Sequence, residues 1–349
     1  MDKLHIGLRA AIWSAALVVG MAMHASARSA PAPGSPPSSQ RAMDAASEAR
    51  ILALAPERIS AADVRDVLSH APAPRVICLQ GSLAPISMRP FAEFLIAMGY
   101  PESQLRDPAD GSFSHGSFAD GEKLAGTLAW YYESEGMRPM LIGHSQGGML
   151  AIRALYELAG EFNDKITVWN PLTDRSEQRS TIVDPIDGIE RPVVGLKLSY
   201  VTALATGKLP RILLGQWTMV SRLRAIPDTV EEFTGFIIEW DGIAGTPPGS
   251  EAYHAIGSAK VRTVWLPNAT SHIAMPQAKE LAVNPVTRAW IDHYVPGENA
   301  VPPTDAGIDA SNILHAADIW FSVKKHWCLE AQKLVRARQA ADPNKGTGG

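Results

Sequence analysis

Cysteine is scarce in this 349-residue sequence, which has only Cys78 and Cys328. Two thiols cannot build the disulfide network of a small secreted domain, and they cannot form a four-thiolate zinc site. We expect two separate buried thiols, with a disulfide between them as the alternative. The sequence also has no H-E-x-x-H motif, no Cys/His ligand cluster and no phosphate-binding loop. It therefore gives no reason to expect a metal or an organic cofactor.

Charge is also modest, because charged residues make up 19% of the chain and the formal net charge is -4. This balance gives no reason to expect nucleic acid or an anionic membrane as a partner. Hydrophobic residues make up 46%, which is a globular composition. The length suits one large α/β domain with insertions, or at most two domains.

Only the N-terminus has a long apolar run. A positively charged start precedes an apolar stretch over about residues 10–23, and the small-residue pattern Ala25-Ser26-Ala27 follows. This order is typical of a secretory signal peptide over 1–27, cleaved after Ala27. The run is shorter than the roughly 20 residues that span a bilayer, so a membrane anchor is the weaker alternative. We expect a periplasmic or secreted protein with no membrane segment once the signal is removed.

Apolar strands alternate with amphipathic helices after a Pro/Ser-rich leader at 28–40, which we expect to be flexible. The alternation predicts an α/β fold over 41–295, with a mostly parallel sheet covered by helices on both faces. Residues 172–232 interrupt it and are interpreted as a helical cap insertion. A linker at 296–310 and a C-terminal helix with a disordered tail at 311–349 complete the chain. The expected strands are 75–80, 102–106, 139–143, 165–170, 234–240 and 260–266, and the expected helices between them are 87–98, 117–135, 146–160 and 276–294.

The sharpest motif is Gly143-His144-Ser145-Gln146-Gly147, which lies between an apolar strand and an amphipathic helix. It matches the G-x-S-x-G nucleophile elbow, in which a tight turn lifts a serine above the sheet and small residues let strand and helix approach closely. The serine then lies at the positive end of the helix. The motif predicts Ser145 as a nucleophile, and a glycine-rich turn with an idle serine is the alternative.

A serine hydroxyl needs a base to take its proton, and after this elbow the acid comes next in the chain and the base last. His272 follows the expected strand 260–266, at the sheet edge where α/β active sites lie. It is the candidate base, and His254 is the alternative.

Asp241 ends another apolar strand at the same edge and is the candidate acid, which would orient the imidazole. Asp174, after an earlier strand, and Glu239, within the strand, are alternatives. Asp241 could also simply form an Asp-Gly turn.

Acyl transfer also needs donors for a developing oxyanion. The first should be the backbone N–H of Gln146, the residue after the nucleophile. The second should be the N–H of Ser82 in the loop Gln80-Gly81-Ser82, which follows the first core strand.

These residues, in this order, resemble the α/β-hydrolase superfamily and, within it, bacterial lipase- and esterase-like enzymes. The resemblance covers about residues 70–295, and Gln80 replaces the histidine of the His-Gly pair found in many lipases and esterases. It implies an α/β-hydrolase fold in which 172–232 forms the cap, and a two-step acyl transfer to water.

Apolar side chains in the expected cap predict a pocket for a small-molecule ester with an apolar part. An amidase or thioesterase with the same triad, or a non-catalytic binding protein, are the alternatives. The residues expected at this pocket are Leu196, Leu198, Tyr200, Leu204, Ile212, Leu213, Leu214, Trp217 and Met219.

Overall fold

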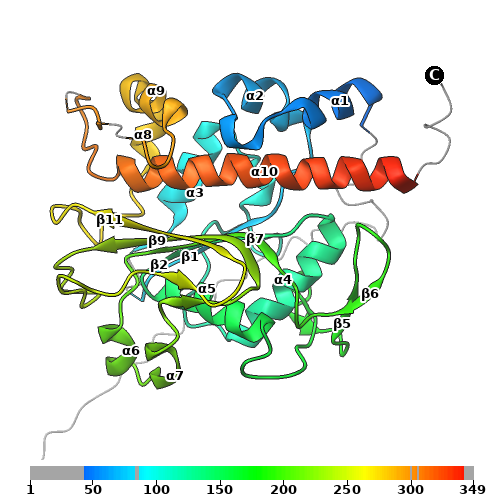
Figure 1. The fold of residues 1–349 in the computed structure, drawn as a ribbon, viewed down its shortest axis with the longest axis horizontal. Helices are drawn as coiled ribbons and strands as arrows, with labels where there is room; N and C mark the ends of the chain where they lie inside the picture. Colours follow the sequence, from blue (N-terminus) through cyan, green and yellow to red (C-terminus); the bar gives the residue numbers. More distant parts are fainter. Residues whose placement is uncertain (1–42, 83–85, 299–300, 305, 342–349) are drawn as a thin grey trace, which may run out of the picture. The chain divides into compact units, whose positions relative to one another are not determined.

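A five-stranded, all-parallel sheet forms the centre of the fold in a computed structural model that describes residues 43–82, 86–298, 301–304 and 306–341 (Figure 1). Its strand order is β1-β2-β7-β9-β11. Parallel strands covered on both faces need apolar side chains on both sides, and β1, β2 and β7 are buried along their whole length. The predicted α/β class and parallel sheet are confirmed. The strands are Val76–Leu79, Met140–His144, Leu198–Leu204, Val230–Ile238 and Lys260–Leu266.

Helices α4 (Gly121–Glu135) and α5 (Gln146–Leu158) cover one face of the sheet. Asp120 caps the start of α4 by accepting the N–H of Glu122, and Gly136 ends the helix in the left-handed region at φ 77°. Helix α5 begins directly after β2 and packs against β1, β2 and β7. The short turn between β2 and α5 therefore lies at the carboxyl edge of the sheet.

The opposite face is covered by α10 (Ile313–Ala341), which runs across the sheet together with α3, α8 and α9 (Figure 1). Trp320 and Trp327 of α10 are fully buried in this layer. Asp318 of α10 accepts a hydrogen bond of 2.8 Å from Arg262 of β11, which ties the helix to the last strand. The remaining bounds in this layer are α1 (Ala45–Ala53), α2 (Ala61–Asp66), α3 (Arg89–Met98), α8 (Lys279–Val283) and α9 (Pro285–His293).

The interval 172–232 differs from the prediction, because residues 198–204 form β7 in the middle of the sheet. A helical interpretation of these residues is wrong. Between β7 and β9 the structure has two short helices, α6 (Leu209–Leu213) and α7 (Trp217–Val220). We call residues 209–220 the α6–α7 segment. The other short elements of the interval are β4 (Arg175–Ser176), β5 (Thr181–Val183), β6 (Glu190–Pro192) and β8 (Ala225–Ile226).

Two predicted strands are also absent from the described sheet. Residues 102–104 form a 3₁₀ turn, and only 169–170 of the expected strand 165–170 are extended, as β3 of a hairpin with β4. The first segment is polar and short, so nothing drives it into a buried sheet.

Cys78 and Cys328 are free and buried, and burial raises the pKa of each thiol to about 12. In the part of the chain that the structure describes, no helix has the length and apolar character to cross a bilayer. The predicted signal peptide and leader lie outside the described residues.

Candidate active site

Ser145 lies in a strained turn between β2 and α5, with φ 53° and ψ -111°. Few non-glycine residues adopt this conformation, and such strain concentrates at functional sites. The Ser145 N–H donates to the carbonyl of Leu204 (2.7 Å), and Thr206 Oγ1 donates to the carbonyl of Ser145 (2.9 Å), which holds the turn against the end of β7. A side chain at Gly147 would collide with the backbone of β1, so the turn requires this glycine. This is the local geometry that the G-x-S-x-G pattern predicts.

Asp241 and His272 meet at the same edge of the sheet, in the loops after β9 and β11. His272 Nδ1 lies 2.6 Å from Asp241 Oδ2, and both residues are more than nine-tenths buried. Burial opposes the charge on Asp241, but hydrogen bonds from His272 and the Ala244 N–H outweigh it and lower the pKa of the carboxyl. Because a carboxylate only accepts, His272 Nδ1 carries the proton and Nε2 is left as an acceptor.

His144, next to the serine, connects the elbow to the loop that carries His272. Its Nε2 lies 2.9 Å from the backbone carbonyl of His272, and the two ring centroids are 5.0 Å apart. Burial, followed by the neighbouring His272, lowers the pKa of His144 to about 3, so its ring is neutral and Nε2–H donates to the carbonyl. The motif gives His144 no role, and its contact with His272 was not predicted from the sequence. No sequence pattern indicates it, because a tertiary loop supplies the partner.

No hydrogen bond joins Ser145 Oγ to His272 among the described residues. Catalytic hydrogen bonds are often long without substrate and tighten in the complex. Ser145 is the chain neighbour of His144, whose ring contacts His272, and all three side chains are buried. The nucleophile and base candidates therefore belong to one cluster.

The loop after β1 passes beside the elbow. A Cβ added to Gly81 would lie 3.4 Å from the Cβ of Ser145. The hydrogen bonds found among the described residues give no acceptor to the N–H of Ser82 or of Gln146. Neither predicted donor is therefore occupied by another described residue, and the one at Gln146 is at the positive end of α5.

The alternative acid and base candidates lie elsewhere. Asp174 has a side chain 75% exposed and forms an ion pair of 2.6 Å with Lys123. Glu239 is half-buried and forms no hydrogen bond or ion pair with His272 among the described residues. Nδ1 of the half-exposed His254 lies 3.7 Å from Oε1 of Glu251. Of the candidates, the structure brings only Asp241 into contact with His272.

The nine residues expected to line an apolar pocket do not lie together in the structure. Five of the nine are buried in the cores on either side of the sheet: Leu196, Leu198, Tyr200, Leu204 and Met219. Their assignment to a cap lining is wrong, because most belong to β7 or pack beneath it. The other four are exposed on the α6–α7 segment: Ile212, Leu213, Leu214 and Trp217.

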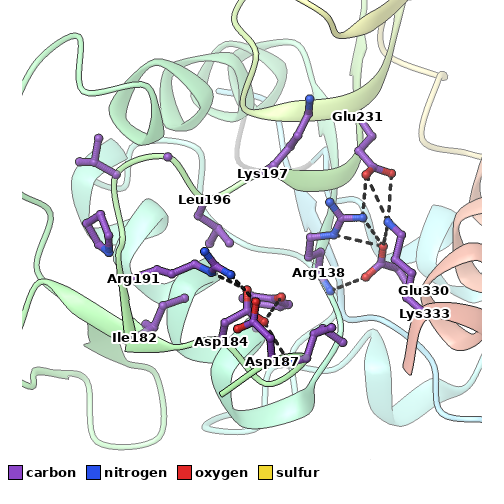
Figure 2. Close-up of a pocket in the computed structure, with 15 residues that line it drawn as sticks. Arg138, Ile182, Asp184, Asp187, Arg191, Leu196, Lys197, Glu231, Glu330 and Lys333 are labelled. Carbon is purple, nitrogen blue, oxygen red and sulfur yellow. Dashed lines mark hydrogen bonds and ion pairs between the residues drawn. The ribbon is translucent and has the colours of Figure 1, made fainter. Parts of the chain in front are cut away.

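A pocket of about 560 Å³ lies away from this cluster (Figure 2). Its lining includes Arg138 and Lys197, just before β2 and β7, and Glu231 near the start of β9. Arg138 forms ion pairs with Glu231 (2.8 Å) and Glu330 (2.6 Å), so its charge is matched. Ligands of open α/β sheets bind at the carboxyl ends of strands, whereas this pocket lies at the amino ends. The cluster around Ser145 is therefore the stronger candidate active site.

Comparison with known proteins adds no relative. No protein-family model matches the chain, and neither curated proteins nor solved structures give a match. In the described ranges, no group of three or more His, Cys, Asp or Glu residues is placed to hold a metal ion. The geometry at the carboxyl edge of the sheet is therefore what indicates a function for this chain.

Proposed function

We propose that this chain is a serine hydrolase of the α/β-hydrolase type that cleaves carboxylic esters. Ser145 is the nucleophile, His272 the base and Asp241 the acid. The observation that carries the proposal is the buried bond of 2.6 Å between His272 and Asp241, beside the strained turn at Ser145. In other proteins a strained turn or a buried carboxylate–imidazole pair can have a purely structural role. The presence of both at one edge of the sheet favours a catalytic role.

The order of strands supports the same proposal. The serine follows β2, the acid follows β9 and the histidine follows β11, so chain order is Ser, Asp, His. All three strands are parallel, and their carboxyl ends therefore meet at one edge. The second oxyanion donor would come from the loop after β1, which pairs with β2. The resemblance to α/β-hydrolases implies this arrangement.

In the proposed reaction, Ser145 Oγ attacks the ester carbonyl carbon while His272 Nε2 takes its proton. Asp241 stabilises the resulting imidazolium, and the N–H groups of Gln146 and Ser82 donate to the oxyanion. His272 then gives the proton to the departing alcohol. Water attacks the acyl-enzyme with His272 as base, which releases the acid and restores Ser145. These steps use no cofactor.

An ester with an apolar portion suits the surroundings, because the α6–α7 segment exposes apolar side chains and contacts the elbow through Arg211 and Gln146. Apolar patches of this kind on a soluble protein commonly mark a binding surface. Export to the periplasm or medium, as the N-terminal pattern predicts, belongs to the same proposal.

Replacing the nucleophile tests the proposal. Ser145→Ala should abolish fluorophosphonate labelling and lower kcat for p-nitrophenyl butyrate by on the order of 10⁶-fold, as for other triad serines. Ser134→Ala, on α4, is the matched control and should label and turn over like wild type. Labelled residues are identified by mass spectrometry of the digested protein. Undiminished ester turnover in Ser145→Ala would overturn the proposal.

A further inference from the structure

Arg211 reaches the candidate active site from the α6–α7 segment. Its side chain is 1% exposed, and its Nη1 donates to the side-chain carbonyls of Gln146 and Gln216. Gln146 directly follows Ser145 and begins α5. A fully buried guanidinium therefore contacts the residue next to the nucleophile.

This guanidinium has no anionic partner in the described part of the chain. No carboxylate lies within ion-pair distance of Arg211, and its Nε has no hydrogen-bond partner. The amide Nε2 of Gln146, which is also buried, lacks a partner as well. Arg211 Nε and Gln146 Nε2 are both hydrogen-bond donors without an acceptor, and they belong to two side chains in contact. An acceptor with a negative charge would satisfy both donors and would also pair with the buried charge of the Arg211 guanidinium, which is costly to leave unpaired.

Other buried arginines show how this chain matches such a charge. Arg75 pairs with Glu135 and Arg138 pairs with Glu330, both across interior contacts. Arg224, which is buried without a carboxylate and whose Nη1 also lacks a hydrogen-bond partner, lies over the ring of Tyr253 at 4.2 Å from its centroid. Arg211 has neither kind of partner, and burial lowers its pKa to about 10. Each of the other three guanidinium groups therefore has a carboxylate or an aromatic ring beside it, and in the described part of the chain Arg211 has neither.

The N-terminus of α5 also favours an anion at this position. This helix has 13 residues, and its first N–H groups have no acceptor within the helix. The partial positive charge there favours an anion beside Gln146. A ligand oxygen between Arg211 and Gln146 would meet this charge and both unmet side-chain donors.

We propose that the side chains of Arg211 and Gln146 form a carboxylate-binding subsite beside Ser145. The substrate is then an ester that also carries a free carboxylate. This inference rests on the proposed hydrolase function and narrows its substrate class. The carboxylate binds the two side chains, and the scissile ester reaches Ser145. The apolar part between them contacts the α6–α7 segment.

Matched substrates test the subsite without a change in the protein. Each pair differs by a carboxylate in place of a methyl group: monomethyl adipate against methyl hexanoate for the acyl side, and 4-(butyryloxy)butanoate against butyl butyrate for the alcohol side. Longer monomethyl esters, up to suberate, vary the distance. Chromatography of the acid released gives kcat/KM for the mature full-length protein. Wild type should favour the carboxylate member of at least one pair by on the order of 100-fold.

Variants of Arg211 distinguish two roles for this side chain: binding the substrate carboxylate, or only holding α6 against α5. Arg211→Met should remove most of this preference, so that the ratio of kcat/KM values falls by on the order of 100-fold, whereas Arg211→Lys keeps the charge and should retain part of it. Arg222→Met, which removes a partly exposed charge just after α7, is the control and should keep the wild-type ratio. If Arg211 is only a structural tie, Arg211→Met alters both members of a pair equally.

The two proposals fail in different ways. Fluorophosphonate labelling of Ser145 with no carboxylate preference in wild type would overturn the subsite and leave the hydrolase proposal standing. Absence of labelling and of all ester turnover would overturn the hydrolase proposal. Calorimetry with monomethyl suberate and with the neutral dimethyl suberate then tests the subsite without turnover, and equal affinities would overturn it too. The wild-type comparisons decide the matter even if Arg211→Met does not fold.

Discussion

Asp241 is buried and is held by three hydrogen bonds in the loop after β9. One oxygen meets His272, and the other accepts the N–H groups of Ile243 and Ala244 at 2.9 and 3.0 Å. These donors stabilise the carboxylate against the cost of burial and fix its orientation before a substrate arrives. A fixed carboxylate in turn fixes the tautomer of the imidazole, with the free nitrogen directed to accept a proton.

Asp241→Asn should lower kcat by about 10³- to 10⁴-fold, because an amide neither stabilises an imidazolium nor holds the correct tautomer. Asp174→Asn is the control, since this exposed side chain pairs with Lys123 away from His272, and it should leave turnover unchanged. Stopped-flow or steady-state hydrolysis of p-nitrophenyl butyrate measures both. If the two effects are reversed, the acid is Asp174, in the turn between β3 and β4, and the assignment to Asp241 is wrong.

Ser145, Asp241 and His272 could be identified as candidates from the sequence, because each follows an apolar strand and their order along the chain is the expected one. Chain order selected Asp241 and His272, and the structure places them in contact. Their catalytic roles stay predictions. The contacts of His144 and Arg211 could not be selected, because each partner is distant in sequence or lies across a segment of irregular structure.

At the scale of elements, β7 shows where pattern reasoning fails. All seven residues of this strand are buried, so it has no alternation of apolar and polar side chains. A short, continuous apolar run cannot be told from a buried helix by its period. The other core strands were recognised because a loop with turn residues or a clear amphipathic helix follows them. The sheet class was therefore predicted correctly while its central strand was assigned to an insertion.

The α6–α7 segment offers a direct test of its part in substrate choice. Leu213 is 74% exposed and Trp217 is 64% exposed, so replacing either with alanine should leave stability nearly unchanged. If they contact substrate, each variant should shift the chain-length profile of p-nitrophenyl esters from acetyl to palmitoyl. Single apolar contacts limit such shifts to about 10- to 200-fold in relative kcat/KM.

Val283→Ala is the matched control for these variants, because this apolar side chain on α8 is 63% exposed and lies outside the α6–α7 segment. Its profile should follow wild type. Identical profiles for Leu213→Ala, Trp217→Ala and wild type would show that these exposed side chains do not select the acyl chain.

At the scale of the whole molecule, buried neutral histidines make stability depend on pH. Burial lowers the pKa of His315, on α10, to about 4 from its ordinary 6.5. Between these values the unfolded chain binds a proton that the folded protein does not, so the free energy of unfolding falls as pH falls. One such group contributes up to about 1.4 kcal/mol per pH unit in this range.

His315→Gln should therefore flatten the decline in stability between pH 6.5 and 4, by up to about 1.4 kcal/mol per pH unit. Urea unfolding at several pH values across this range measures the slope. His293→Gln, which replaces an exposed histidine on α9, is the control and should keep the wild-type slope. Equal slopes in wild type and His315→Gln would contradict the assignment of this acid sensitivity to His315.

Helix α10 also determines when the fold can be completed during synthesis. A ribosome releases all five strands before it releases this helix, and Trp320 and Trp327 are the large side chains that close one face of the sheet. Until they emerge, apolar side chains such as Phe236 on β9 lack the part of their cover that α10 supplies. A nascent chain in this state exposes surface to chaperones and cannot lock into its final packing. Late closure of the fold would suit the export proposed for this chain, because passage through a narrow translocation channel requires a polypeptide that has not yet folded.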